Sequence, residues 1–118
     1  MHEQISIRTC IKGGSELAEF NMPDDTLIYK ATEIFSALAD STRLKILSSL
    51  ATADMHVGAL VELLGVSQPA VSHQLRLLRD RGLVLAHRQG QQVIYSFADE
   101  HIRSLIMLGL EHAAERTN

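Results

Sequence analysis

Residues 57–80 read VGALVELLGVSQPAVSHQLRLLRD, and they set the architecture expected for the whole chain. The apolar run 57–64 predicts a short helix that stops at Gly65. Ser67 is a good N-cap for a second helix, and Pro69 suits its first turn. Two helices joined by a short glycine turn form a helix-turn-helix. We therefore expect the rest of the chain to support this motif.

The second of these helices has two different faces. Val71, Leu75 and Leu78 recur at spacings of four and three, which predicts one buried stripe. The candidate DNA-contacting side chains lie on the opposite face and at the exposed N-terminus: Gln68, Ser72, His73 and Arg76. Gln forms paired hydrogen bonds with adenine, whereas Arg binds phosphates. The alternative for His73 is an exposed histidine without a function.

A β-hairpin is expected directly after this helix. Residues 83–88 read as an extended strand, Gln89-Gly90 as a two-residue turn, and Val93, Tyr95 and Phe97 as the inward residues of a return strand. Arg88 and Gln91 give the tip a basic, polar character. A hairpin at this position is a wing that contacts flanking phosphates or the minor groove. The alternative, a hairpin with a structural role only, would explain the strands but not the basic, polar tip.

The distribution of charge also favours a nucleic-acid partner. The formal net charge is -3, yet residues 66–95 contain four arginines and one aspartate. A local basic patch on an acidic body suits phosphate contact, although a solvated helix face would have the same composition. No apolar run is long enough to span a membrane and no secretory signal is visible. With the single cysteine Cys10, these features indicate a cytoplasmic protein without a membrane partner.

The N-terminal part is expected to support the motif. Residues 1–22 show no sustained period and predict a flexible arm, so that residues 23–118 form one winged-helix DNA-binding and dimerisation domain. Pro23 to Asp25 read as a helix start, and Asp40 or Ser41 as the cap of the next helix. The expected fold is mainly α with a small β-hairpin, a winged helix-turn-helix.

The last helix is expected in residues 99–115, DEHIRSLIMLGLEHAAE, with Asp99 as its N-cap. Ile102, Leu105, Ile106, Gly109 and Ala113 form one apolar stripe. Met107, Leu108 and Leu110 lie off this stripe, so the helix has more apolar surface than one small core requires. We therefore expect a partner helix, which a homodimer joined through its N- and C-terminal helices would supply.

The same helix carries four candidate metal ligands, Asp99, His101, His112 and Glu115. The two histidines lie on one side of the helix but roughly 16 Å apart along it, whereas zinc holds its ligands at about 2 Å. One chain therefore cannot join them around one ion. Two antiparallel copies would place Asp99 and His101 beside the partner's other pair and create two equivalent sites. The alternative is an amphipathic helix with charged ends.

At this point the sequence resembles the ArsR/SmtB family of winged-helix metal-sensing repressors. The resemblance lies in LADSTRL at 38–44, GVSQPAVSHQL at 65–75 and RQGQ at 88–91. It implies a homodimer that binds a double-stranded operator with imperfect twofold symmetry and leaves it when an effector binds. The zinc-sensing branch has an Asp-x-His pair and, eleven residues after that His, a second His that is followed three residues later by Glu or His. The four candidate ligands match this pattern, which implies two zinc ions per dimer, with cobalt or nickel as substitutes.

One departure from the family pattern limits the range of metals that the protein is expected to sense. Another branch senses soft metals through a Cys-x-Cys pair, and His56 and Gly58 stand at those positions here. Arsenic, lead and copper(I) need thiolates, so sensing of these metals is not expected. A repressor of the same fold that senses oxidation at Cys10 is the nearer alternative function. A metalloenzyme is disfavoured, because four protein ligands leave zinc no position for an activated water.

Overall fold

The computed structural model describes residues 21–116. Residues 1–20 and 117–118 lie outside the described part, and so do Cys10 and nearly all of the predicted arm. The chain divides into two compact units, Met1–Thr32 and Glu33–Asn118.

The first unit contains the beginning of helix α1 (Asp25–Leu38). The backbone N–H of Leu27 donates to Oδ1 of Asp24 over 2.8 Å, so Asp24 caps the helix. The predicted helix start at Pro23 to Asp25 is therefore confirmed. The last turns of α1, from Glu33 onward, belong to the second unit.

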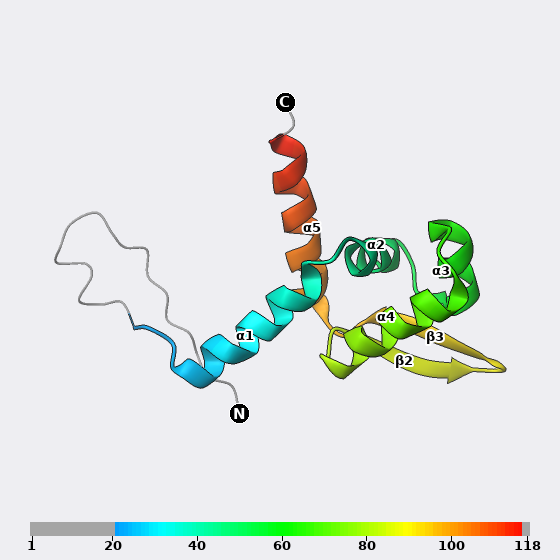
Figure 1. Cartoon of the computed structure of the whole chain (residues 1–118), viewed down its shortest axis with the longest axis horizontal. Helices are drawn as coiled ribbons and strands as arrows, with labels where there is room; N and C mark the ends of the chain where they lie inside the picture. Colours follow the sequence, from blue (N-terminus) through cyan, green and yellow to red (C-terminus); the bar gives the residue numbers. More distant parts are fainter. Residues whose placement is uncertain (1–20, 117–118) are drawn as a thin grey trace. The chain divides into compact units, whose positions relative to one another are not determined.

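The second unit is a winged helix-turn-helix, as predicted, and Figure 1 shows its elements in sequence colours. After α1 the order is α2 (Ser41–Leu50), β1 (Met55–His56), α3 (Val57–Leu64), α4 (Gln68–Asp80), β2 (Val84–Gln89), β3 (Gln92–Phe97) and α5 (Glu100–Glu115). Antiparallel pairing gives the strand order β1-β3-β2. None of the described helices combines the length and apolar content needed to cross a membrane.

The sheet differs from the sequence prediction in two details. The predicted hairpin is present, but the two-residue strand β1 is added to it through the pairs Met55–Tyr95 and His56–Ile94. Gln89 pairs with Gln92, so the turn is Gly90-Gln91 and not Gln89-Gly90. Gly90 has a φ of 67°, a left-handed conformation that favours glycine in the first position of such a turn.

Capping side chains mark where the helices begin. Asp40, not Ser41, caps α2 by accepting from the N–H of Arg43, and Ser67 caps α4 as predicted. Asp99 caps α5, also as predicted. Each such cap satisfies a backbone donor that has no partner inside its helix, which contributes about 1 kcal/mol.

The core is aliphatic apart from Phe97 and lies between α2, α3, α4, the sheet and the start of α5. Seven of its members have no exposed surface at all: Ile46, Leu47, Leu50, Leu60, Val71, Leu75 and Leu78. Fully burying one such side chain contributes about 1.5–3 kcal/mol. Three of these seven belong to α4, so the helix expected to contact DNA is anchored by the core itself.

Candidate functional site

The polar face of α4 points to solvent. Gln68, His73 and Arg76 are exposed and Ser72 is half-buried, whereas the three residues of the opposite stripe are fully buried. Gly65, at a φ of 68°, ends α3 in a left-handed conformation and lets the chain turn directly into α4. The four predicted contact residues therefore lie on the solvent-facing side of α4, a helix of 13 residues.

The β2–β3 hairpin supplies the rest of the predicted interface. Figure 1 shows its tip projecting away from the helices of the second unit. Arg88 and Gln91 are both exposed at this tip. Such a tip can contact the DNA backbone while a neighbouring helix contacts the bases.

Exposed arginines on these two elements have no acidic partner within residues 21–116. Among the described residues, no Asp or Glu forms an ion pair with Arg76, Arg79 or Arg88, whereas Arg81 pairs with Glu33 and Arg103 with Glu100. An arginine that is not neutralised within the chain remains available to a phosphate. The helix and the hairpin therefore form a polar, locally basic surface that suits nucleic acid.

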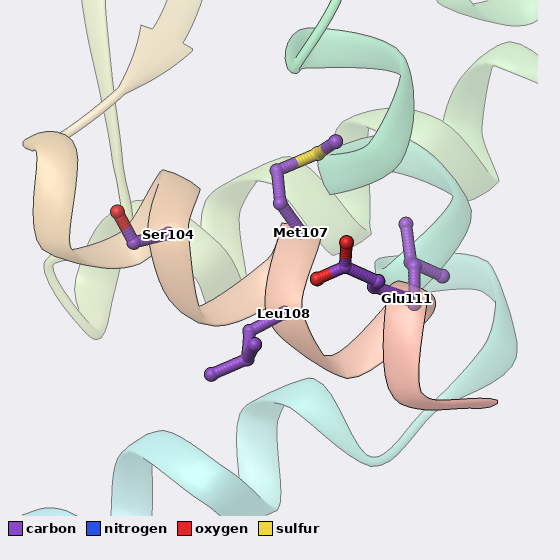
Figure 2. Close-up of a pocket in the computed structure, with 5 residues that line it drawn as sticks. Ser104, Met107, Leu108 and Glu111 are labelled. Carbon is purple, nitrogen blue, oxygen red and sulfur yellow. The ribbon is translucent and has the colours of Figure 1, made fainter. Parts of the chain in front are cut away.

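Helix α5 is only half covered by its own chain. Ile102 and Ile106 are buried, but Met107 is 48% and Leu108 is 63% exposed. Figure 2 shows a surface hollow at this point, lined by Ser104, Met107, Leu108, Leu110 and Glu111. All five residues come from α5, so the hollow is the surface of a single helix and is not a cleft between two elements.

The four predicted metal ligands are found at the two ends of α5. Oδ1 of Asp99 lies 3.6 Å from Nδ1 of His101, and the His101 side chain is 96% exposed. His112 and Glu115 are exposed in the last turn. Within residues 21–116 the structure brings no three metal-binding side chains of the His, Cys, Asp or Glu type together. The donors are of the kind zinc accepts, but each end of the helix holds only two of the four predicted ligands.

His56 has a structural role that the sequence did not reveal. Its Nδ1 accepts a hydrogen bond from the backbone N–H of Ala59 over 3.2 Å, so the imidazole caps α3. A Cβ atom at Gly58 would lie only 3.0 Å from Cε1 of His56, which explains why glycine suits this position. At the two positions where the resemblance would place a pair of cysteines, His56 therefore caps the helix and Gly58 leaves room for its ring.

Comparisons with known proteins agree with this geometry. A family model described as bacterial regulatory protein, arsR family, matches residues 40–85. The chain is 46% identical over 83 residues to a transcriptional repressor SmtB homolog of Synechocystis sp., covering 70% of this chain and 63% of that protein. The match therefore spans less than two thirds of that relative's length.

Two solved structures are also similar. One is the homodimeric winged helix-turn-helix DNA-binding domain of a possible ArsR-family regulator from Mycobacterium bovis. It is 31% identical with a TM-score of 0.75, and the match covers 80% of this chain and 91% of that one. The other is the AntR antimony-specific transcriptional repressor. It is 29% identical with a TM-score of 0.77, and the match covers 92% of this chain and 98% of that one.

Proposed function

The chain belongs to the arsR family of bacterial regulatory proteins, and we propose that it is a repressor whose metal-free dimer binds a twofold-symmetric operator and is released by zinc. The observation that carries this proposal is the exposed polar face of α4 beside a basic wing. A regulator that acts by binding DNA needs no catalytic group.

Each predicted DNA contact has a role in this proposal. Gln68, Ser72 and His73, in the first half of α4, are placed to meet base edges in the major groove. Arg76 follows one turn later and binds a backbone phosphate. Arg88 and Gln91 contact the flanking phosphates or the minor groove from the wing. In this proposal Gln68, Ser72 and His73 determine sequence preference, and the arginines contribute affinity for any DNA.

A second copy of the chain is proposed as the partner of α5. The exposed Met107, Leu108 and Leu110 give this helix an apolar surface that the described part of the chain leaves uncovered. The similar domain from Mycobacterium bovis is homodimeric. Two copies related by a twofold axis could place their α4 helices about 34 Å apart, one turn of DNA, and so occupy successive major grooves.

The same arrangement would complete the metal sites. Asp99 and His101 of one subunit, with His112 and Glu115 of the other, would supply two imidazoles and two carboxylates, a donor set that suits zinc and accepts cobalt or nickel. Bound zinc would fix the two α5 helices at one angle. Because the neutral imidazole is the form that binds zinc, we expect zinc binding to release protons.

Repression and release would then be a shift between two dimer geometries. If the geometry favoured by metal changes the spacing of the two α4 helices, operator affinity falls. The coupling free energy for such linked events is typically about 1–3 kcal/mol, and the operator must weaken zinc binding by the same factor.

The test compares DNA binding with and without zinc at constant salt. The probe is a duplex selected by the wild-type protein from a random library, since the operator is to be identified. Stoichiometric zinc should lower the affinity of the wild type about 5- to 150-fold. The variant His112→Ala should bind the same duplex but lose the response to zinc.

The control variant is His87→Ala, which removes an equally exposed histidine from β2. It should retain the zinc response whatever it does to overall affinity. Equal affinity of the wild type with and without zinc would end the regulatory proposal and leave the DNA-binding one intact. Failure of the library to yield any preferred duplex would end both.

A further inference from the structure

A single arginine outside the recognition helix α4 holds it to the end of α1. Nε of Arg43 donates to the carbonyl oxygen of Ala37 over 2.7 Å, and Nη1 donates to Oε1 of Gln74 over 3.0 Å. Arg43 lies in the first turn of α2, and Gln74 is in the middle of α4. One guanidinium thus connects three helices.

The carbonyl of Ala37 is a natural acceptor for a cation. It belongs to the last four residues of α1, whose carbonyls have no partner inside the helix. The C-terminus of a helix also attracts positive charge, and α1 has no basic residue of its own in its last turn. Because a guanidinium is planar and rigid, an arginine held at Ala37 fixes the direction of its other donors.

Gln74 occupies the position on α4 where such a bond controls rotation. It is half-buried and lies between the buried stripe of Val71, Leu75 and Leu78 and the outer face that carries His73. The buried stripe is aliphatic, and apolar burial has no directional preference. Close packing of this stripe anchors α4 to the core, and directional contacts add a further restraint on small rotations of the helix about its own axis. A hydrogen bond to a charged donor is directional and resists them.

A weaker second contact ties the end of α4 to the same helix. Nη1 of Arg81, just after α4, lies 3.2 Å from the carbonyl oxygen of Glu33 and 3.2 Å from its Oε1. Glu33 is one helical turn before Ala37. Both of these side chains are more than a third exposed, so the ion pair contributes little. The half-buried Arg43 contact is therefore the dominant connection.

We propose that Arg43 is a positioning residue for DNA recognition: through Gln74 it sets the rotation of α4 and hence the direction of Ser72, His73 and Arg76. This inference rests on the proposed function, because it needs α4 to read DNA. It goes beyond the proposed function because it assigns part of the sequence preference to Arg43, a side chain that contacts no DNA. Loss of the contact should reduce binding to a preferred duplex more than binding to arbitrary DNA.

The experiment measures the ratio of two affinities for each variant. One probe is the duplex selected from the random library, and the other is poly(dI-dC) at the same salt concentration. Arg43→Lys keeps the charge but not the rigid fork, and Gln74→Met keeps the volume but not the acceptor. Each should lower the ratio about tenfold, the effect of roughly one lost hydrogen bond to a charged group. The double variant should be no worse than either single one.

Two further variants test whether a lower affinity ratio results from lost positioning of α4 or from another cause. Gln74→Glu retains the acceptor for Arg43, so it should restore the ratio even though its negative charge weakens binding to both probes. Ile46→Val removes one methyl group from the fully buried core of α2 and should lower the melting temperature without changing the ratio.

Three results would overturn the inference. Arg43→Lys could leave the ratio unchanged while Gln74→Met lowers it, which would make Gln74 a direct contact to DNA. The two single effects could add in the double variant, so that the residues act independently. Ile46→Val could lower the ratio as much as Arg43→Lys, and the role of Arg43 would then be stability alone. A wild type without any preferred duplex would instead refute the proposed function.

Discussion

Helices α4 and α5 begin in the same way and are covered very differently. Both have a side-chain cap at the N-terminus, and both carry an apolar stripe. Every member of the α4 stripe is fully buried, whereas the apolar residues of α5 beyond Ile106 are exposed. The first helix completes its packing within one chain, and the second does not. An apolar stripe in a sequence therefore predicts burial without specifying the molecule that provides it.

The largest expected effect is a difference in folding stability between substitutions in the apolar residues of α4 and those of α5. Leu75→Ala creates a cavity at a fully buried position of α4 and should lower the free energy of unfolding by about 2–5 kcal/mol. Leu108→Ala, on the exposed part of α5, should lower it by less than about 0.5 kcal/mol when measured at concentrations where the chain is monomeric. Urea denaturation followed by circular dichroism measures both. Similar losses for the two variants would show that α5 is buried by its own chain.

A second prediction concerns the assembly. Leu108→Glu places a charge on the surface proposed to meet a second copy, and burying it without a partner is costly. The dimer dissociation constant should rise about 100-fold, which corresponds to about 2.7 kcal/mol. Analytical ultracentrifugation over a dilution series would measure this constant.

The matched control is Leu85→Glu, the same substitution at a leucine of β2 that is 54% exposed. It should leave the dimer constant unchanged, because β2 is not part of the proposed interface. Equal effects of the two substitutions would mean that added charge alone, and not its place on α5, governs association.

The sequence predicted those parts of the fold that depend on short-range patterns. The caps at Ser67 and Asp99, the buried face of α4 and the hairpin each follow from residues within one or two turns of each other. Strand β1 was missed because two residues show no period, and its pairing with β3 joins segments 40 residues apart. The hairpin turn was placed one residue early because Gly90 suits either position of a two-residue turn and only the pairing of Gln89 with Gln92 separates them.

The candidate sites also show that local sequence patterns predict local features but not contacts between distant residues. The exposed face of α4 could be predicted because helical geometry alone separates it from the buried one. The contact between Arg43 and Gln74 spans 31 positions in the sequence and leaves no local signal. The metal ligands remain a prediction, since their proposed site needs a second chain, and no pattern within one chain reports how two copies meet.

The smallest expected effect lies at Asp99, where the stability of α5 and the proposed metal site depend on one side chain. Oδ1 of Asp99 accepts from the N–H of Ile102 over 3.1 Å, and the same atom lies 3.6 Å from His101. Asp99→Asn retains a capping oxygen, so it should change the free energy of unfolding by only a few tenths of a kcal/mol, whereas Asp99→Ala should lower it by about 1 kcal/mol. Zinc affinity, measured by competition with a chelator, should fall for both, since the amide of Asn carries no charge and is a poorer zinc ligand than a carboxylate. If Asp99→Asn bound zinc as tightly as the wild type, Asp99 would be a cap alone and the proposed four-ligand set would be wrong.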